Sequence, residues 1–171
     1  IRPAYARTDT FFQAIPLVLQ RWPNVCFVCP GMAGQAEAEH WANRIHRPPN
    51  LRLLAGLPQP ALWNLFSHSD ITLSITTHDG TPNTLLEAMA CGCLPIAGDI
   101  ESLREWITPG INGLLVDPHN PQALAEAIVL ALTNPTLRHQ AAELNLKLIQ
   151  QRAEINLVRA QLAVFYQRFT S

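Results

Sequence analysis

The stretch that decides the fold is Ser74–Asp99, which reads SITTHDGTPNTLLEAMACGCLPIAGD. A strand end, a short polar loop, a helix and a second strand follow one another in it. Thr81 is a suitable N-cap, and Pro82 fits the first helical position, where its missing N–H costs nothing. Gly92 is expected to end the helix at the C′ position. The stretch therefore predicts a strand–loop–helix–strand unit with its helix at residues 82–90.

The same alternation extends on both sides of this unit. Short apolar strands are predicted at 25–29, 51–54, 71–75, 94–97 and 114–116, and helices lie between them at 9–22, 36–45, 59–68, 82–90 and 103–107. Strands that alternate with helices of this length indicate an α/β fold, a Rossmann-like doubly wound parallel sheet. Ligands of such sheets lie beyond the carboxyl ends of the strands. Function is therefore expected in the loops 30–35, 55–59, 76–82 and 98–101.

Only helices are predicted after the last strand, at 121–132, 135–150 and 154–169. The last of them carries an apolar stripe at helical spacing, made of Ile155, Val158, Leu162, Phe165 and Phe169. Either the stripe packs on this domain's own core, or it lacks its natural cover and favours self-association. A length of 171 residues suits one domain. We predict a single domain over 1–171, with the α/β core at about 1–117 and a helical tail at 118–171.

The composition excludes several classes of protein. Lys and Arg number 12 against 13 Asp and Glu, for a net charge of −1, which argues against nucleic-acid binding and a polybasic membrane anchor. Charges interrupt every apolar run short of a membrane span. We expect a cytoplasmic protein, with peripheral attachment to the cytoplasmic membrane face through a missing part as an alternative. The chain begins with Ile1 rather than Met, so the lack of a leader means little.

The four cysteines do not suggest a metal or redox site. Cys26 and Cys29 lie three apart on a predicted strand, where their side chains point to opposite faces and cannot share one ion. Cys91 and Cys93 flank Gly92 at a helix end. We interpret them as buried, small apolar residues in a reducing compartment, and expect no metal.

The polar loop before the helix carries the candidate chemistry. Free amides around Thr81–Asn83 and the positive end of the helix dipole form an anion site, and Gly80 lets the backbone approach a ligand closely. Glu87 leans back toward the helix N-terminus, where its carboxylate can accept hydrogen bonds from a ribose diol. The alternative is a glutamate paired with a neighbouring base, and chemistry alone leaves both open.

Three segments together resemble the retaining group-1 glycosyltransferases of GT-B fold. Asp79 and Glu87, with seven residues between them, are similar to the E-x7-E motif of that family. The EAMACG segment at 87–92, with Pro95-Ile96 after it, is similar to the family's next motif. GINGLLV at 110–116, followed by PQALA at 121–125, resembles its downstream segment. The similarity runs from about residue 2 to the last helix.

This resemblance implies an architecture and an activity. GT-B enzymes have two Rossmann-like domains facing across a cleft, and this chain resembles the C-terminal, donor-binding one with extra C-terminal helices, the last of which typically crosses back to the other domain. The full-length enzyme would transfer a hexosyl unit from a nucleotide-diphosphate sugar with retention, using no metal or other cofactor. The chain alone is expected to be inactive, because its acceptor domain is absent. The alternatives are a GT-B sugar-nucleotide epimerase and a non-catalytic nucleotide-binding module.

The resemblance also implies residue roles. Glu87 would bind the donor's ribose and Asp79 the transferred sugar, and both are the expected catalytic residues. The segment Thr81, Pro82 and Asn83, with Gly80 before it, would hold the diphosphate or sugar, and Leu57 in the turn 56–58 would receive the nucleobase. Arg2 and Arg7 would neutralise the diphosphate, unless they are solvated surface arginines.

Four points depart from the family pattern or stay open. The first strand of the family's domain is mostly absent, since only Ile1 and Arg2 could belong to it. Asp79 replaces the usual first glutamate and shortens its reach by about one methylene. Arg7 replaces a lysine, which keeps the charge but changes the geometry. His78, next to Asp79, is either an acid or base or, more commonly for a loop histidine, a solvated side chain. The sugar, the base and the acceptor do not follow from the sequence.

Overall fold

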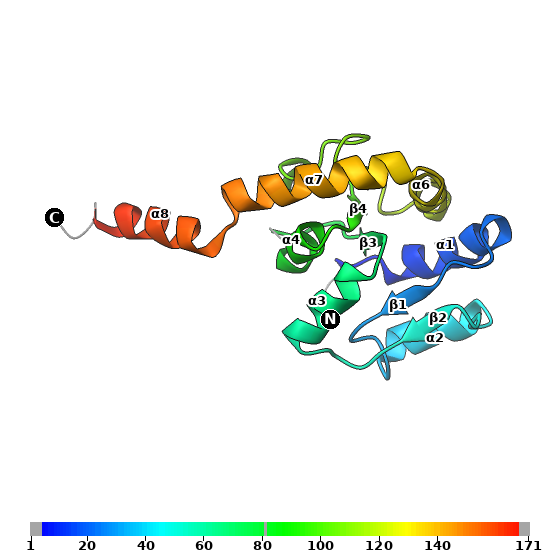
Figure 1. Cartoon of the computed structure of the whole chain (residues 1–171). Coiled ribbons are helices and arrows are strands. Elements are labelled where there is room, and N and C mark those ends of the chain that lie inside the picture. The colour runs from blue at the N-terminus through cyan, green and yellow to red at the C-terminus, as the bar shows by residue number, and fades with distance from the viewer. Residues whose placement is uncertain (1–4, 81, 168–171) are drawn as a thin grey trace.

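Helices and strands alternate along the chain in the computed structural model, which describes residues 5–80 and 82–167 (Figure 1). The α/β part consists of α1 (Thr8–Arg21), β1 (Phe27–Cys29), α2 (Ala36–Arg44), β2 (Leu51–Leu53), α3 (Gln59–Ser67), β3 (Ile71–Ser74), α4 (Asn83–Ala90), β4 (Leu94–Gly98), α5 (Glu101–Arg104) and β5 (Leu114–Val116). Three helices follow, α6 (Pro121–Thr133), α7 (Pro135–Arg152) and α8 (Ile155–Gln167). The predicted order of elements is confirmed throughout the described residues.

All the strand pairs are parallel, as predicted, but they form two sheets instead of one continuous sheet. β1 pairs with β2, and β3, β4 and β5 form the second sheet in that order. No strand in the described part of the chain bridges β1 and β3. The α/β class is correct. The first strand, to which only Ile1 and Arg2 were expected to belong, lies outside the described residues.

Helices cover both faces of the larger sheet. Leu94 and Ile96 of β4 pack with the α1 and α6 side chains, whereas Ala97 packs with Leu85 and Met89 of α4 on the other face. Successive side chains of a strand point to opposite faces, so a strand covered on both sides must be apolar throughout. All five residues of β4 are buried accordingly. This double cover leaves the carboxyl ends of the strands as the open edge.

α7 is fastened to the loop before β5 by two buried asparagines. Nδ2 of Asn112 donates to Oδ1 of Asn145 at 2.9 Å, and Nδ2 of Asn145 donates to the carbonyl of Asn112 at 2.9 Å. A Cβ on the neighbouring Gly113 would lie 2.7 Å from Cγ of Pro95, so that position has no room for a side chain. The GINGLLV segment therefore serves packing between α7 and the sheet.

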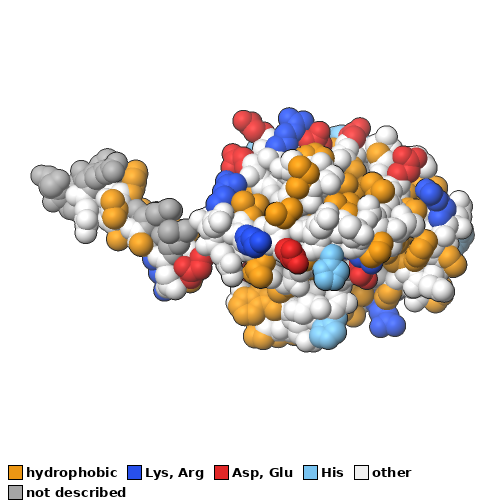
Figure 2. Space-filling model, turned by 45° about the horizontal axis from the view of Figure 1, so that its top comes forward, with side chains coloured by type: hydrophobic (Ala, Val, Ile, Leu, Met, Phe, Trp, Pro, Cys, Tyr) orange, Lys and Arg blue, Asp and Glu red, His pale blue; other side chains and the backbone are white. Residues whose placement is uncertain are grey.

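α8 points away from the rest of the molecule (Figure 1). Three members of the predicted apolar stripe are exposed, namely Ile155 (58%), Leu162 (48%) and Phe165 (51%), and Figure 2 shows apolar side chains along this arm. The alternative in which these three side chains pack on the domain's own core is therefore wrong. Phe169 lies outside the described residues. No helix of the described residues is both long and apolar enough to cross a membrane.

Candidate functional site

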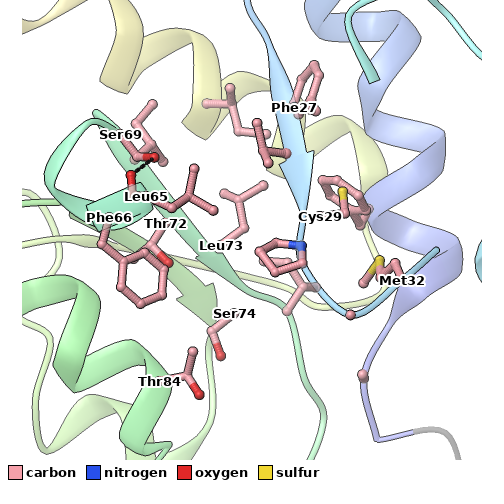
Figure 3. A pocket seen from close by; sticks show the side chains of 18 of the residues that line it. Phe27, Cys29, Met32, Leu65, Phe66, Ser69, Thr72, Leu73, Ser74 and Thr84 are labelled. Carbon is pink, nitrogen blue, oxygen red and sulfur yellow. Dashed lines mark hydrogen bonds between the residues drawn. The ribbon is translucent and has the colours of Figure 1, made fainter. Parts of the chain in front are cut away.

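A cavity of about 1210 Å³ opens at the carboxyl ends of the strands, and Figure 3 shows part of its lining. The predicted binding loops after β1, β2 and β3 all contribute to this end of it. Gly31, Leu57 and Asp79 each come from a different one of these loops, and Thr84 comes from the first turn of α4. The fold thus brings together loops that are separated by tens of residues in the sequence, as expected for a doubly wound sheet.

The segment before α1 is fixed to the loop after β3. The N–H of Arg7 donates to the carbonyl of Ile75 at 2.8 Å, and the N–H of Thr77 donates to the carbonyl of Tyr5 at 2.9 Å. These bonds place Arg7 in the same cavity as Asp79. A cation is thereby held at the edge where the sequence predicts an anion site.

The side chain of Arg7 is half-buried. Its Nη2 donates to Oδ2 of Asp9 at 2.5 Å, and its buried Nε has no hydrogen-bond partner within residues 5–80 and 82–167. The alternative of a solvated surface arginine is therefore wrong for Arg7. Arg2 lies outside the described residues.

The loop after β3 leaves Asp79 exposed at the cavity. Thr76 shapes this loop, because its hydroxyl donates to the carbonyl of His78 at 2.9 Å. His78 is exposed, and its ring lies against that of Tyr5 with the centroids 5.1 Å apart. Asp79 and Gly80 are exposed as well. The carboxylate of Asp79 is thus available to a ligand hydroxyl.

The start of α4 differs by one residue from the prediction. α4 begins at Asn83, and Pro82 is its N-cap with φ −76° and ψ 99°. Because this ψ is extended, Pro82 is not the first helical residue, and the cap assigned to Thr81 is wrong by the same shift; Thr81 itself lies outside the described residues. The first amides of a helix lack intrahelical acceptors. Those of Asn83 and Thr84 accordingly sit at the helix end that favours an anion.

Glu87 is held by two neutral donors from α3. Its Oε1 accepts a hydrogen bond from Nε2 of Gln59 at 3.1 Å, and its Oε2 accepts one from Nε1 of Trp63 at 3.1 Å. Neither partner is basic, so the alternative of a neighbouring base is wrong for the described residues. Gln59 directly follows the turn 56–58, which carries Leu57. Glu87 therefore lies beside that turn, although it does not line the cavity itself.

Gln59 and Trp63 were missed by the sequence reasoning. They lie one helical turn apart and on one face of α3, directly after a predicted binding turn. Their place after that turn was visible in the sequence, but their contact with Glu87 and the 42% exposure of Trp63 are known only from the structure.

Two further carboxylates near the open edge are already paired. Asp99, after β4, accepts a hydrogen bond from Nε of Arg104 at 2.6 Å, and this guanidinium lowers the pKa of Asp99. Glu39 accepts from the N–H of Gly34 and from Arg47, and both interactions lower its pKa. Within the described ranges, no group of His, Cys, Asp or Glu side chains is arranged to hold a metal ion.

The sequence and the fold were compared with those of known proteins. The sequence profile described as "Glycosyl transferases group 1" matches residues 4–147. The chain is a member of the group 1 glycosyltransferase family.

One sequence relative and two solved structures are similar to this chain. The D-inositol 3-phosphate glycosyltransferase of Corynebacterium urealyticum is 27% identical over 139 residues, which is 77% of this chain and 33% of that protein. The C-terminal domain of a group 1 glycosyl transferase (LpcC) from Francisella tularensis superposes with a TM-score of 0.77 at 21% identity, covering 90% of this chain and 82% of that one. Anabaena HepE in complex with UDP-glucose gives 0.85 at 18% identity, covering 97% and 46%.

The fold of this group 1 glycosyltransferase chain is thus that of a GT-B C-terminal domain, as predicted. The chain spans about one third of the length of the C. urealyticum relative.

Proposed function

We propose that this chain binds the nucleotide-diphosphate sugar donor of a retaining hexosyltransferase. The observation that carries the proposal is the convergence of Arg7, Asp79 and the start of α4 on one cavity at the carboxyl edge, with Glu87 held beside the turn 56–58. The fold neighbour HepE was solved with UDP-glucose, which supports a donor of this class. The roles of Arg2 and Thr81 rest on the family resemblance alone.

Each group has a defined task in the transfer. Arg7 and the first amides of α4 would stabilise the diphosphate as the bond between its oxygen and the anomeric carbon breaks. The diphosphate leaves with the electron pair of the broken bond. The acceptor oxygen forms the new bond to that carbon on the same face, and its proton passes to the departing phosphate oxygen. Glu87 would hold the ribose through its two oxygens, and Asp79 would hold hydroxyls of the sugar. The family resemblance implies that these steps need no metal.

The acceptor would come from an upstream domain outside this chain. We therefore expect the isolated chain to bind donor weakly, because half of the cleft is missing and burial of the ligand is incomplete. It should catalyse no transfer. Efficient sugar transfer by these 171 residues alone would overturn this assignment.

Calorimetry with UDP, GDP and ADP, and with their sugars, tests donor binding directly. Glu87→Ala should weaken binding of the preferred nucleoside diphosphate by about 1–3 kcal/mol, the scale of hydrogen bonds to a charged group. Glu37→Ala, at an exposed position of α2, is the matched control and should bind normally. Normal binding by Glu87→Ala, or its failure to fold, would identify Glu87 as a structural residue.

A further inference from the structure

Two aromatic side chains lie near Asp79 at the carboxyl end of the cavity. Tyr5 and His78 both line it, and their ring centroids lie 5.1 Å apart with the ring planes inclined by 47°. His78 is the residue directly before Asp79, whereas Tyr5 comes from the segment before α1. The fold therefore brings an aromatic pair to the carboxylate that the proposed function assigns to the sugar.

The backbone that carries Tyr5 is fixed to the loop after β3. The carbonyl of Tyr5 accepts hydrogen bonds from the N–H of Thr77 at 2.9 Å and from the hydroxyl of Thr77 at 3.4 Å. The next residue, Ala6, forms an antiparallel bridge with Thr76. The Tyr5 ring thus projects from a backbone that is held at two successive residues. A ligand that binds this ring has little ordering of the chain to offset.

The backbone of His78 is held in place as well. The hydroxyl of Thr76 donates to the carbonyl of His78 at 2.9 Å, and the N–H of His78 donates to the same hydroxyl oxygen at 3.4 Å. This turn directly precedes Asp79. Aromatic rings in contact stabilise each other beyond the area that they bury, so the His78 ring supports that of Tyr5.

The contact with His78 leaves much of the Tyr5 ring open. Tyr5 is 48% exposed, and it lines a cavity instead of a convex surface. The face of an aromatic ring is negative and attracts the slightly positive hydrogens of C–H groups. The open ring surface is therefore suited to a ligand that has one flat face of C–H groups.

The charged side chains around the ring define the rest of the ligand. Arg7 lies two residues after Tyr5 in an extended segment, where alternate side chains point to one face about 7 Å apart. Arg7 and Tyr5 accordingly line the same cavity. Asp79 supplies an exposed carboxylate directly after His78. A small molecule on the Tyr5 ring can therefore reach a cation and a hydrogen-bond acceptor.

A hexopyranose joined to a diphosphate matches this combination. One face of its ring consists of C–H groups, its edge carries hydroxyl donors, and a single oxygen links its anomeric carbon to the phosphate. A nucleobase is also flat, but it offers no hydroxyl to Asp79 and lies at the opposite end of the diphosphate. A purely apolar ligand would leave both charged groups unused.

We propose that Tyr5, supported by His78, is the stacking surface for the hexosyl ring of the donor. The C–H face of the sugar covers the open face of the Tyr5 ring while the sugar hydroxyls reach Asp79. The inference rests on the proposed function, because it adds a residue to the same donor site. It makes Tyr5 a determinant of the sugar and not of the nucleotide.

Calorimetry with matched ligands tests the proposal. The pairs are UDP with UDP-glucose, GDP with GDP-mannose, and ADP with ADP-glucose. Tyr5→Leu keeps an apolar side chain but removes the flat ring. It should weaken binding of the sugar nucleotide by about three- to tenfold, the scale of one aromatic contact, and leave binding of the bare nucleotide unchanged. Tyr5→Phe keeps the ring and should bind both ligands like the parent chain.

Saturation-transfer NMR gives a second readout that a structural role of Tyr5 would not change. When the aromatic protons of the chain are saturated, the signal should pass to the C–H protons on one face of the hexose. The transfer should be present in the parent chain and in Tyr5→Phe, and much weaker in Tyr5→Leu. The parent chain alone is informative, and absence of transfer to the hexose would overturn the proposal whatever the stability of Tyr5→Leu.

The outcomes separate this inference from the proposed function. If the parent chain binds none of the six ligands, both are wrong. If a nucleotide binds but all three chains have equal affinity for its sugar derivative, only the assignment of Tyr5 is wrong. Equal weakening of bare and sugar nucleotide by Tyr5→Leu also contradicts it, because the ring would then contact the nucleobase or order the phosphate site. Selective weakening of the sugar nucleotide, restored in Tyr5→Phe, supports it.

Discussion

At the scale of single residues, the position of Glu87 depends on its two donors. Trp63→Phe removes one N–H and leaves Oε2 without that bond, while the ring still covers the same surface. We expect affinity for the nucleoside diphosphate to fall by about 0.5–1.5 kcal/mol, the net value of one hydrogen bond. Calorimetry beside Trp41→Phe, the same change on α2, checks it. Equal affinities of the two variants would assign Trp63 to packing alone.

Asp79 departs from the family pattern, so its variant separates sugar from nucleotide recognition. Asp79→Ala should leave UDP or GDP affinity of this chain almost unchanged. The full-length enzyme should lose its preference among donor sugars and much of its rate, because in the proposed function the carboxylate of Asp79 holds the sugar directly or through water. Rates with several donors and calorimetry with the bare nucleotide measure the two effects. A large loss of nucleotide binding would show that Asp79 orders the phosphate loop.

The cysteines should differ in reactivity because they differ in burial. The prediction that they are buried is confirmed for Cys29 and Cys93 and wrong for Cys26, which is exposed just before β1. Burial raises the pKa of the Cys29 thiol to about 12, with Cys26 adding to it, and burial likewise raises that of Cys93 to about 12. At pH 8 both therefore stay protonated, and the thiolate is the reactive form. Iodoacetamide should label exposed Cys26 and half-buried Cys91 in the native chain, and all four only after unfolding. Native labelling of Cys29 or Cys93, located by mass spectrometry, would contradict this.

At the scale of elements, the end of β4 and the loop after β3 are in direct contact. A Cβ on Gly98 would lie 2.3 Å from the carbonyl oxygen of Thr76, a backbone atom that cannot move aside. Gly98→Ala should therefore destabilise the fold by about 1–3 kcal/mol and displace the loop that carries Asp79. Gly80→Ala meets no atom within 4 Å and is the control. Thermal unfolding of both variants measures the difference, and equal midpoints would show that the contact relaxes freely.

The sequence patterns predicted the helices and strands well, because residues close together in the chain determine where each helix or strand begins and ends. The apolar run of β4 and the Gly92 stop of α4, which has φ +95°, are found as expected. The predicted start of α4 was wrong by one residue, because proline suits both the N-cap and the first helical position. Contacts between distant residues were beyond the sequence, as the donors to Glu87 from Gln59 and Trp63 show.

At the scale of the whole molecule, α8 exposes apolar side chains that the rest of the described chain does not cover. Ile155 and Leu162 are 58% and 48% exposed on one stripe, and α8 extends beyond the body that α1 to α7 form. Isolated apolar side chains on a surface are ordinary, but a continuous stripe of them favours association. In the full-length enzyme, the resemblance to GT-B proteins implies that this helix packs on the other domain. We propose that in the 171-residue chain two copies cover each other's stripe instead.

Leu162→Glu tests this pairing. Burying a leucine contributes about 1.5–3 kcal/mol, so placing a charge there should raise the dimer dissociation constant by about tenfold or more. Ala160→Glu adds the same charge at an exposed position of α8 on the face opposite the stripe and is the control, which should associate like the parent chain. Sedimentation velocity over a range of concentrations gives both constants, and circular dichroism verifies that α8 still folds. A parent chain that stays monomeric at every concentration would refute self-association. The other domain of the full-length enzyme would then be the remaining partner for the stripe. In that enzyme, Leu162→Glu should weaken the packing of α8 on the other domain and lower the transfer rate.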